Sequence, residues 1–213
     1  MRLRNIKGSK EFIGQSPFVV HHPEDYKGCW HNFFQNDHPI HLEIGMGKGQ
    51  FIHTLAEQNP DINYLGIEMY SSVLYRALER RAGTELPNLY FLRFDAKNLT
   101  EIFGPAEVGR IYLNFSDPWP KERHAKRRLT SPDFLSLYDT VLAPSGYIQF
   151  KTDNRRLFDY SVESVKNSHW TIDELTYDLY HSSFLDGNIM TEYETRFVAE
   201  GKPICRFIIS RVP

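Results

Sequence analysis

Five carboxylates in this sequence lie at, or just after, the ends of segments that are predicted to be β-strands. In chain order they are Glu43, Glu68, Asp95, Asp117 and Asp153. In an open α/β sheet, ligands bind outside the carboxyl ends of the parallel strands. We therefore expect the five acids to line one edge of a sheet and to form the polar part of a binding site.

A glycine-rich turn directly follows the first of these acids. Gly45, Gly47 and Gly49 allow the backbone to approach a ligand closely. The dinucleotide pattern G-x-G-x-x-G is broken at Gln50, and the phosphate-binding pattern G-x-x-x-x-G-K-[ST] is absent. A carboxylate such as Glu43 disfavours a pyrophosphate but favours a ligand with an ammonium group and a positive charge. S-adenosylmethionine carries an α-ammonium and a sulfonium, so the pattern favours a methyltransferase over a dehydrogenase.

The next two acids have the spacing that a nucleoside needs. Glu68 lies 25 residues after Glu43, where a carboxylate can accept hydrogen bonds from both ribose hydroxyls. Asp95 can accept from the exocyclic amine of adenine, and the small Ala96 lets the ring lie close. For Asp95 and Asp153 there is an equally good alternative, because an aspartate after a strand often caps the following helix.

The stretch FSDPWPKERHAKRR, residues 115–128, combines a stiff turn with positive charge. Each of its two prolines pushes the preceding residue toward an extended backbone, which would hold Asp117 and Trp119 at the edge of the sheet. Five of the eight residues 121–128 are Lys or Arg, although the whole chain has a net charge of −2. This local basic patch predicts phosphate binding. Trp119 either stacks on an extruded base or packs beneath the loop.

Strand and helix patterns alternate along most of the chain, which predicts an open, doubly wound α/β sheet. Parallel strands are expected at residues 39–44, 64–68, 89–93, 110–115 and 146–150. Helices are expected over 50–57, from Ser71 or Ser72 to a stop at Gly83, from Ser131-Pro132 onward, and over 155–166. The segments 171–178 and 204–212 are predicted to pair antiparallel at one edge. Residues 1–38 are interpreted as a basic arm with a lead-in helix near 23–36, and residues 39–213 as a single domain.

The totals restrict the class of protein. A chain of 213 residues is long enough for one self-supporting domain. Its two cysteines, Cys29 and Cys205, are far apart, which suits a reducing cytoplasm and offers neither a disulfide framework nor a zinc site. The basic start lacks the apolar core of a signal peptide, and no stretch approaches the ~20 apolar residues of a membrane span. We expect a cytoplasmic protein without a metal; the oligomeric state stays open, with a homodimer among the options.

Six motifs occur in one order along the chain: EIGMGKGQF, GIE, FDA, NFSDPWPKERHAKRRL, FKTDN and TEYE. Together they closely resemble the bacterial tRNA (guanine-N7-)-methyltransferase family. The resemblance implies a Rossmann-like class I methyltransferase fold, with a mostly parallel seven-stranded sheet and an antiparallel C-terminal strand. It also implies transfer of a methyl group from S-adenosylmethionine to N7 of the guanosine at position 46, in the variable loop of tRNA.

The resemblance assigns roles to individual residues. It implies that Asp117 is catalytic and that Glu43, Glu68, Asp95 and Asp117 contact the cofactor. The expected cofactor site also includes Gly45, Gly47 and Ala96, on the residue pattern described above. The resemblance implies substrate contacts from Lys121, Asp153, Thr191, Glu192, Tyr193 and Glu194, and RNA contacts from Arg123, His124, Lys126, Arg127 and Arg128. The four residues 191–194 also fit a helix capping box. One departure is Met69-Tyr70, where the family pattern has charged residues.

The expected chemistry needs alignment more than proton transfer. Guanine N7 has an in-plane lone pair that is unprotonated at neutral pH, and the ring becomes cationic as the methyl group arrives. A carboxylate beside the ring would stabilise that charge, with Asp117 as first candidate and Asp153 as second. Two alternatives stay open: a methyltransferase of another RNA or of an amino group, and an RNA-binding protein without catalysis on the same fold.

Overall fold

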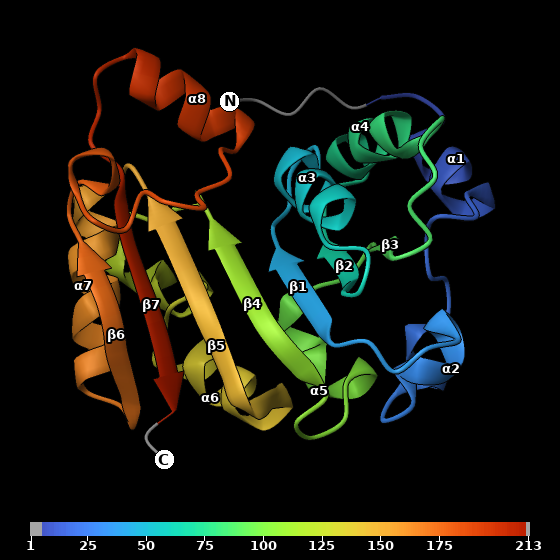
Figure 1. Cartoon of the computed structure of the whole chain (residues 1–213), viewed down its shortest axis with the longest axis horizontal. Helices are drawn as coiled ribbons and strands as arrows, with labels where there is room; N and C mark the ends of the chain where they lie inside the picture. The colour runs from blue at the N-terminus through green and yellow to red at the C-terminus, as the bar shows by residue number, and fades with distance from the viewer. Residues whose placement is uncertain (1–5, 212–213) are drawn as a thin grey trace.

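The computed structural model describes residues 6–211 and contains a seven-stranded sheet (Figure 1). The strands lie in the order β3-β2-β1-β4-β5-β7-β6. Their bounds are β1 Ile40–Ile44, β2 Asn63–Ile67, β3 Leu89–Leu92, β4 Val108–Asn114, β5 Leu142–Thr152, β6 Trp170–Thr176 and β7 Cys205–Arg211. β7 is antiparallel to both of its neighbours, and the pairs among β1 to β5 are parallel. The predicted sheet with an antiparallel C-terminal strand is confirmed.

Helices cover both faces of this sheet. One face of the sheet, over β1 to β3, is covered by α1, α3 and α4. The opposite face is covered by α5, α6 and α7 (Figure 1). The bounds are α1 Ser9–Gln15, α2 Trp30–Phe34, α3 Gln50–Gln58, α4 Ser71–Arg81, α5 Leu99–Ile102, α6 Pro132–Val141, α7 Arg155–Lys166 and α8 Glu192–Ala199. Four 3₁₀ turns complete the described chain: η1 Pro23–Tyr26, η2 Ala96–Asn98, η3 Glu122–Arg127 and η4 Leu179–His181. Each face of the sheet therefore has its own apolar core.

Local signals placed the helix ends well. α6 begins with Pro132 at its first position and Ser131 as the N-cap residue, as predicted, although the Ser131 side chain makes no capping hydrogen bond. Gly83, with a φ of 86°, follows the end of α4 and continues the chain in a left-handed conformation. The predicted lead-in helix near 23–36 is real, but it is split into η1 and α2.

Part of the expected arm is ordered against the domain. Residues 9–15 form α1, which packs on α4 with the Phe12 and Tyr75 rings 4.8 Å apart. Val19 then forms a parallel bridge to Phe91 of β3 and so covers the exposed edge of that strand. Lys10 lies in α1 and Lys7 just before it, whereas the basic residues at positions 2 and 4 lie outside the described residues. The sequence analysis expected an arm here and did not predict the helix at Ser9–Gln15.

The topology brings the carboxyl ends of the central strands to one place. The carboxyl ends of β4 and β5 point toward α8, which follows the connection from β6, and the end of β1 lies next to that of β4 (Figure 1). Of the five acids that the sequence analysis singled out, Glu43 lies near the end of β1, and Glu68, Asp95, Asp117 and Asp153 follow the ends of β2 to β5. None of the helices in residues 6–211 combines the length and hydrophobicity that crossing a bilayer would need.

Candidate active site

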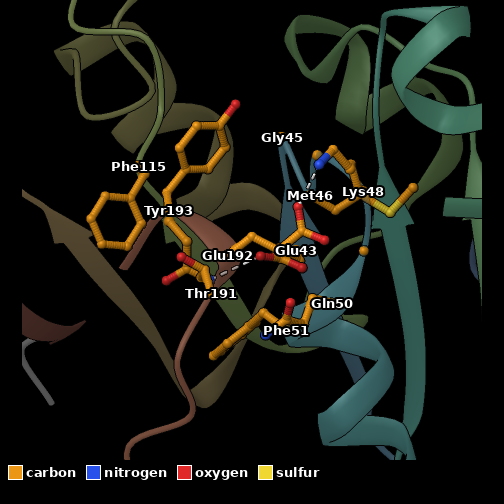
Figure 2. A pocket seen from close by; sticks show the side chains of 13 residues that line it. Glu43, Gly45, Met46, Lys48, Gln50, Phe51, Phe115, Thr191, Glu192 and Tyr193 are labelled. Atoms are coloured by element: carbon orange, nitrogen blue, oxygen red, sulfur yellow. Dashed lines mark hydrogen bonds and ion pairs between the residues drawn. The ribbon is translucent and has the colours of Figure 1, made fainter. Parts of the chain in front are cut away.

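A pocket opens between the glycine turn and the start of α8 (Figure 2). It is lined by residues 45–51 on one side and residues 191–193 on the other, with Glu43, Asn114 and Phe115 between them. Gly45, Gly47 and Gly49 have φ angles of 73°, 60° and 74°, in the region where other residues are strained. A Cβ atom at Gly45 or Gly47 would meet nothing within 4 Å. The turn thus presents bare backbone to the pocket, as a closely bound ligand requires.

A polar row crosses the sheet at the floor of this pocket. Glu43, Asn114 and Lys151 lie on the adjacent strands β1, β4 and β5. One oxygen of Glu43 accepts a hydrogen bond from Asn114 Nδ2 at 2.9 Å. The other, Oε2, is buried and has no hydrogen-bond partner within residues 6–211. Burial raises the pKa of Glu43 to about 8. A buried carboxylate oxygen left without a partner is an acceptor suited to a cationic or ammonium group.

Glu68 connects the second strand to the glycine turn. Its carboxylate accepts hydrogen bonds from the backbone N–H groups of Gly47, at 3.3 Å, and Tyr70, at 2.9 Å. Burial raises the pKa of Glu68, and the nearby negative charge of Asp117 adds to the effect. The Met69 and Tyr70 side chains are exposed at this edge. The departure from the family pattern therefore leaves the backbone contacts of Glu68 in place.

The alternative role of Asp95 and Asp153, as caps of the helices that follow them, holds for Asp95 but not for Asp153. Asp95 does cap the turn η2, since its Oδ1 accepts from the backbone N–H of Lys97 at 3.1 Å. At the fifth strand the cap of α7 is Asn154, whose Oδ1 accepts from the Leu157 N–H at 2.9 Å. Asp153 takes no part in that cap and lies 4.0 Å from the Lys202 ammonium. Capping thus accounts for Asp95 in part and does not account for Asp153.

The loop after β4 is held by more than its prolines. Phe115 and Trp119, at either end of it, have φ angles of 50° and 41°, which are unfavourable for residues with a Cβ. The backbone carbonyl of Trp119 accepts hydrogen bonds from Arg128 Nε and Nη2 at 3.3 and 3.1 Å. Asp117 lies between these two points with an exposed side chain. The loop therefore presents the Asp117 carboxylate outward from a constrained backbone.

The basic run divides into exposed and buried members. Lys121, Arg123, Lys126 and Arg127 are exposed on and beside η3, and His124 is half-buried. The Arg128 side chain is only 6% exposed, because it lies over the Tyr160 ring and pairs with Glu122. Its guanidinium donates hydrogen bonds within the protein, to the Trp119 carbonyl and to Glu122, and the expected RNA contact of Arg128 stays a prediction.

A buried ion pair that sequence reasoning missed holds the segment that covers the pocket. Lys151 and Glu194 are both fully buried, with 2.6 Å between Nζ and Oε2. Lys151 also donates to Asn188 Oδ1 and to the carbonyl of Ile189, both at 2.9 Å. Glu194 accepts further hydrogen bonds from Asn188 and from the Tyr180 hydroxyl. A lysine directly after apolar residues of a central strand was the signal, since an unpaired lysine is almost never buried.

The start of α8 is anchored on the pocket side as well. Thr191 and Glu194 form the predicted capping box, with 3.0 Å from the Glu194 N–H to Thr191 Oγ1. Glu192 pairs with Lys48 at 2.8 Å and with Arg80 at 2.6 Å, across from the glycine turn. Both carboxylates expected to contact substrate are therefore engaged within the protein. Tyr193, between them, points its ring toward the open pocket (Figure 2).

The shifted pKa of Glu43 makes the stability of the ligand-free protein depend on pH. Between pH 4.5 and about pH 8, Glu43 is protonated in the folded protein but ionised in the unfolded chain. The stability that the protonated Glu43 provides is fully present below pH 4.5 and is lost as the pH rises through about 8. Glu43→Gln should therefore become more stable than the parent as the pH rises, with a melting temperature roughly 5 °C higher at alkaline pH.

Thermal unfolding of Glu43→Gln from acidic to alkaline pH would measure this difference. Glu85→Gln serves as the control, because Glu85 is exposed. A difference in melting temperature between Glu43→Gln and the parent that does not change with pH would contradict the assignment.

Known proteins resemble this chain in sequence and in fold. The model of a family described as putative methyltransferase matches residues 37–207. A tRNA (guanine-N(7)-)-methyltransferase of Lachnoclostridium phytofermentans is 63% identical over 99% of each chain. One of Bacillus subtilis is 50% identical over 97% of each chain. A solved structure described as an antibiotic-related methyltransferase has a TM-score of 0.65, covers 97% of this chain and 99% of its own, and is 17% identical.

The strand order, the glycine turn and the pocket together define a Rossmann-like class I methyltransferase. Sequence identity over nearly the whole chain is more specific than the fold. The chain belongs to the bacterial tRNA (guanine-N(7)-)-methyltransferase family.

Proposed function

We propose that this protein transfers a methyl group from S-adenosylmethionine to N7 of the variable-loop guanosine, position 46, of tRNA. The observation that carries the proposal is a juxtaposition at one edge of the sheet. A pocket with one unpartnered, buried carboxylate oxygen, Glu43 Oε2, opens beside a constrained loop that carries Asp117 and an exposed basic run. The relatives named above supply the substrate class, and tRNA as substrate supports a location in the cytoplasm.

The residues of the pocket fit the cofactor. Glu43 would accept from the α-ammonium group, and the bare turn at Gly45 and Gly47 would lie along the methionine part. Glu68 would accept from the ribose, and Asp95 with Ala96 would border the adenine. When bound, S-adenosylmethionine supplies the electrophilic methyl group. An ammonium beside Glu43 would also keep that carboxyl ionised, because a nearby positive charge lowers its raised pKa.

The contribution of the chain to the chemistry is positioning and electrostatics. Guanine N7 needs no base to remove a proton before it is methylated, so alignment supplies most of the rate. Asp117 would stabilise the positive charge that develops on the purine ring. Asp117 and Asp153 could also accept from guanine N1–H and N2–H, which adenine lacks. Lys121 and Thr191 are the further candidates for contact with the nucleotide.

The exposed part of the basic run should provide the salt-dependent part of tRNA binding. The double variant Arg123→Ala/Arg127→Ala should weaken binding and reduce the slope of log K against log salt by about 2, since each lost phosphate contact removes slightly less than one. Binding titrations at several salt concentrations would measure this slope. Lys27→Ala/Lys166→Ala removes two exposed charges elsewhere and should leave the slope unchanged. An equal loss of slope in both variants would contradict a local RNA surface.

The proposed activity is tested with labelled methyl donor and two tRNA transcripts. Purified protein should label an unmodified transcript that carries the variable-loop guanosine, and it should not label one with adenosine there. Equal labelling of both transcripts would refute the site. Labelling of ribosomal RNA or protein without tRNA would favour a methyltransferase of another substrate, and binding of tRNA without any labelling would favour a non-catalytic RNA-binding protein.

A further inference from the structure

An exposed aromatic side chain stands at the mouth of the pocket. Tyr193 is 51% exposed, the largest exposed fraction among the big hydrophobic side chains of the described residues. Tyr193 of α8 and Phe115 of the loop after β4 both line the pocket (Figure 2). Phe197 contacts both rings, with centroid distances of 5.8 Å to Phe115 and 6.3 Å to Tyr193. Leaving such a surface in water costs free energy, so a ligand that covers it would bind favourably.

These rings are held in place by the contacts around them. The capping box and the buried Lys151 pair fix Glu194 on one side of Tyr193. Glu192, on its other side, is paired with two cations. The planes of the Tyr193 and Phe197 rings are 27° apart, and half of the Tyr193 side chain is exposed, so it can take up a further flat ring. A surface ordered before binding loses little entropy when a flat ligand stacks on it.

Trp119, the aromatic residue that the sequence analysis considered for stacking, is less available. The Arg127 guanidinium lies over its ring, 4.9 Å from the centroid, and the His124 ring is 5.8 Å away. Two hydrogen bonds from Arg128 to its carbonyl hold its backbone. The contacts of Trp119 are those of packing within the loop, whereas Tyr193 faces the pocket directly.

We propose that Tyr193, backed by Phe197 and flanked by Phe115, is the surface on which the methyl-accepting guanine stacks after it leaves the tRNA. The inference rests on the proposed function and names the residues that hold the base. Stacking uses the flat face of a purine and leaves its edges free. The edges can then be read by carboxylates, so Tyr193 would supply affinity for any purine while Asp117 supplies the choice of guanine.

The test compares Tyr193→Leu with Tyr193→Phe, which keeps the ring and removes the hydroxyl. Loss of one base stack should lower kcat/KM for tRNA about 10- to 100-fold in Tyr193→Leu, whereas Tyr193→Phe should stay within about twofold of the parent. Calorimetric titration should give the same affinity for S-adenosylmethionine in all three proteins. Tyr177→Leu, at another exposed tyrosine, is the control and should match the parent.

A fluorescent base gives a readout that a structural role would not change. A transcript with 2-aminopurine in place of the target guanosine reports stacking through its emission. Bound to Tyr193→Leu, this transcript should differ in emission from the parent complex, and bound to Tyr193→Phe it should not. Trp119→Leu should leave the emission of the parent complex in place.

Three results would overturn the assignment. Tyr193→Leu could retain parental kcat/KM and emission; Trp119→Leu alone could change the emission; or Tyr193→Leu could weaken cofactor binding as much as it lowers turnover, which would place the ring against the cofactor. A failure of the proposed function is distinguishable from these results, because the parent protein itself would then label no tRNA. The assignment of Tyr193 as a stacking surface would fail together with that function.

Discussion

Replacing Asp117 by alanine is expected to abolish methyl transfer while the protein stays folded. Asp117 is exposed, and it lies between two constrained backbone positions at the pocket edge. Removing a preorganised charge that stabilises a developing opposite charge costs roughly 10²- to 10³-fold in rate. Loss of its contacts to the guanine edge would add to this. Single-turnover methylation of the tRNA transcript measures the loss directly.

Two further variants separate charge from shape in this prediction. Asp117→Asn keeps a hydrogen-bond acceptor but loses the charge, so it should retain only a small part of the rate. Asp186→Ala removes an exposed acid elsewhere and should retain full activity. The melting temperature should be nearly the same in all three variants, because exposed substitutions usually change stability by less than about 0.5 kcal/mol. Full activity of Asp117→Ala would show that this carboxylate has no catalytic role.

Replacing Lys151 by methionine is expected to destabilise the protein more than any other single change considered for it. The substitution leaves Glu194 fully buried without its cation, and breaking a buried pair in this way costs about 3–5 kcal/mol. For a chain of this length that corresponds to a fall of roughly 10 °C in melting temperature. Binding of S-adenosylmethionine should weaken as well, because residues 188–194 cover the pocket and depend on this pair.

The matched comparison is an ion pair of similar length on the surface. Arg155 and Asp159 are 2.9 Å apart, and both are exposed. Arg155→Met should lower the free energy of unfolding far less than Lys151→Met, because a solvent-exposed ion pair contributes little to stability. The double variant Lys151→Met/Glu194→Gln should recover part of the lost stability, because no buried charge is left unpaired. Similar losses of unfolding free energy in Lys151→Met and Arg155→Met would contradict the importance of burial.

The sequence by itself determined the framework of this protein. Alternating strand and helix patterns, each with its own local end signals, predicted the parallel strands, and the segments after residue 170 predicted the antiparallel pairing of β6 and β7. The acids at the strand ends and the glycine turn predicted the edge at which the pocket lies. These inferences succeeded because periodicity, capping and turn chemistry depend on residues close together along the chain.

The tertiary structure alone decided which charged residues are exposed and which are buried and hold the fold. Arg128 and Arg127 are adjacent in the basic run, yet one is buried against Tyr160 and the other is exposed. Likewise Glu194 is enclosed by Lys151, 43 residues earlier, while Glu192 reaches Lys48, 144 residues away. No local pattern specifies such partners. The energy of a charge depends on its burial and on its neighbours in space, and only the folded chain determines both.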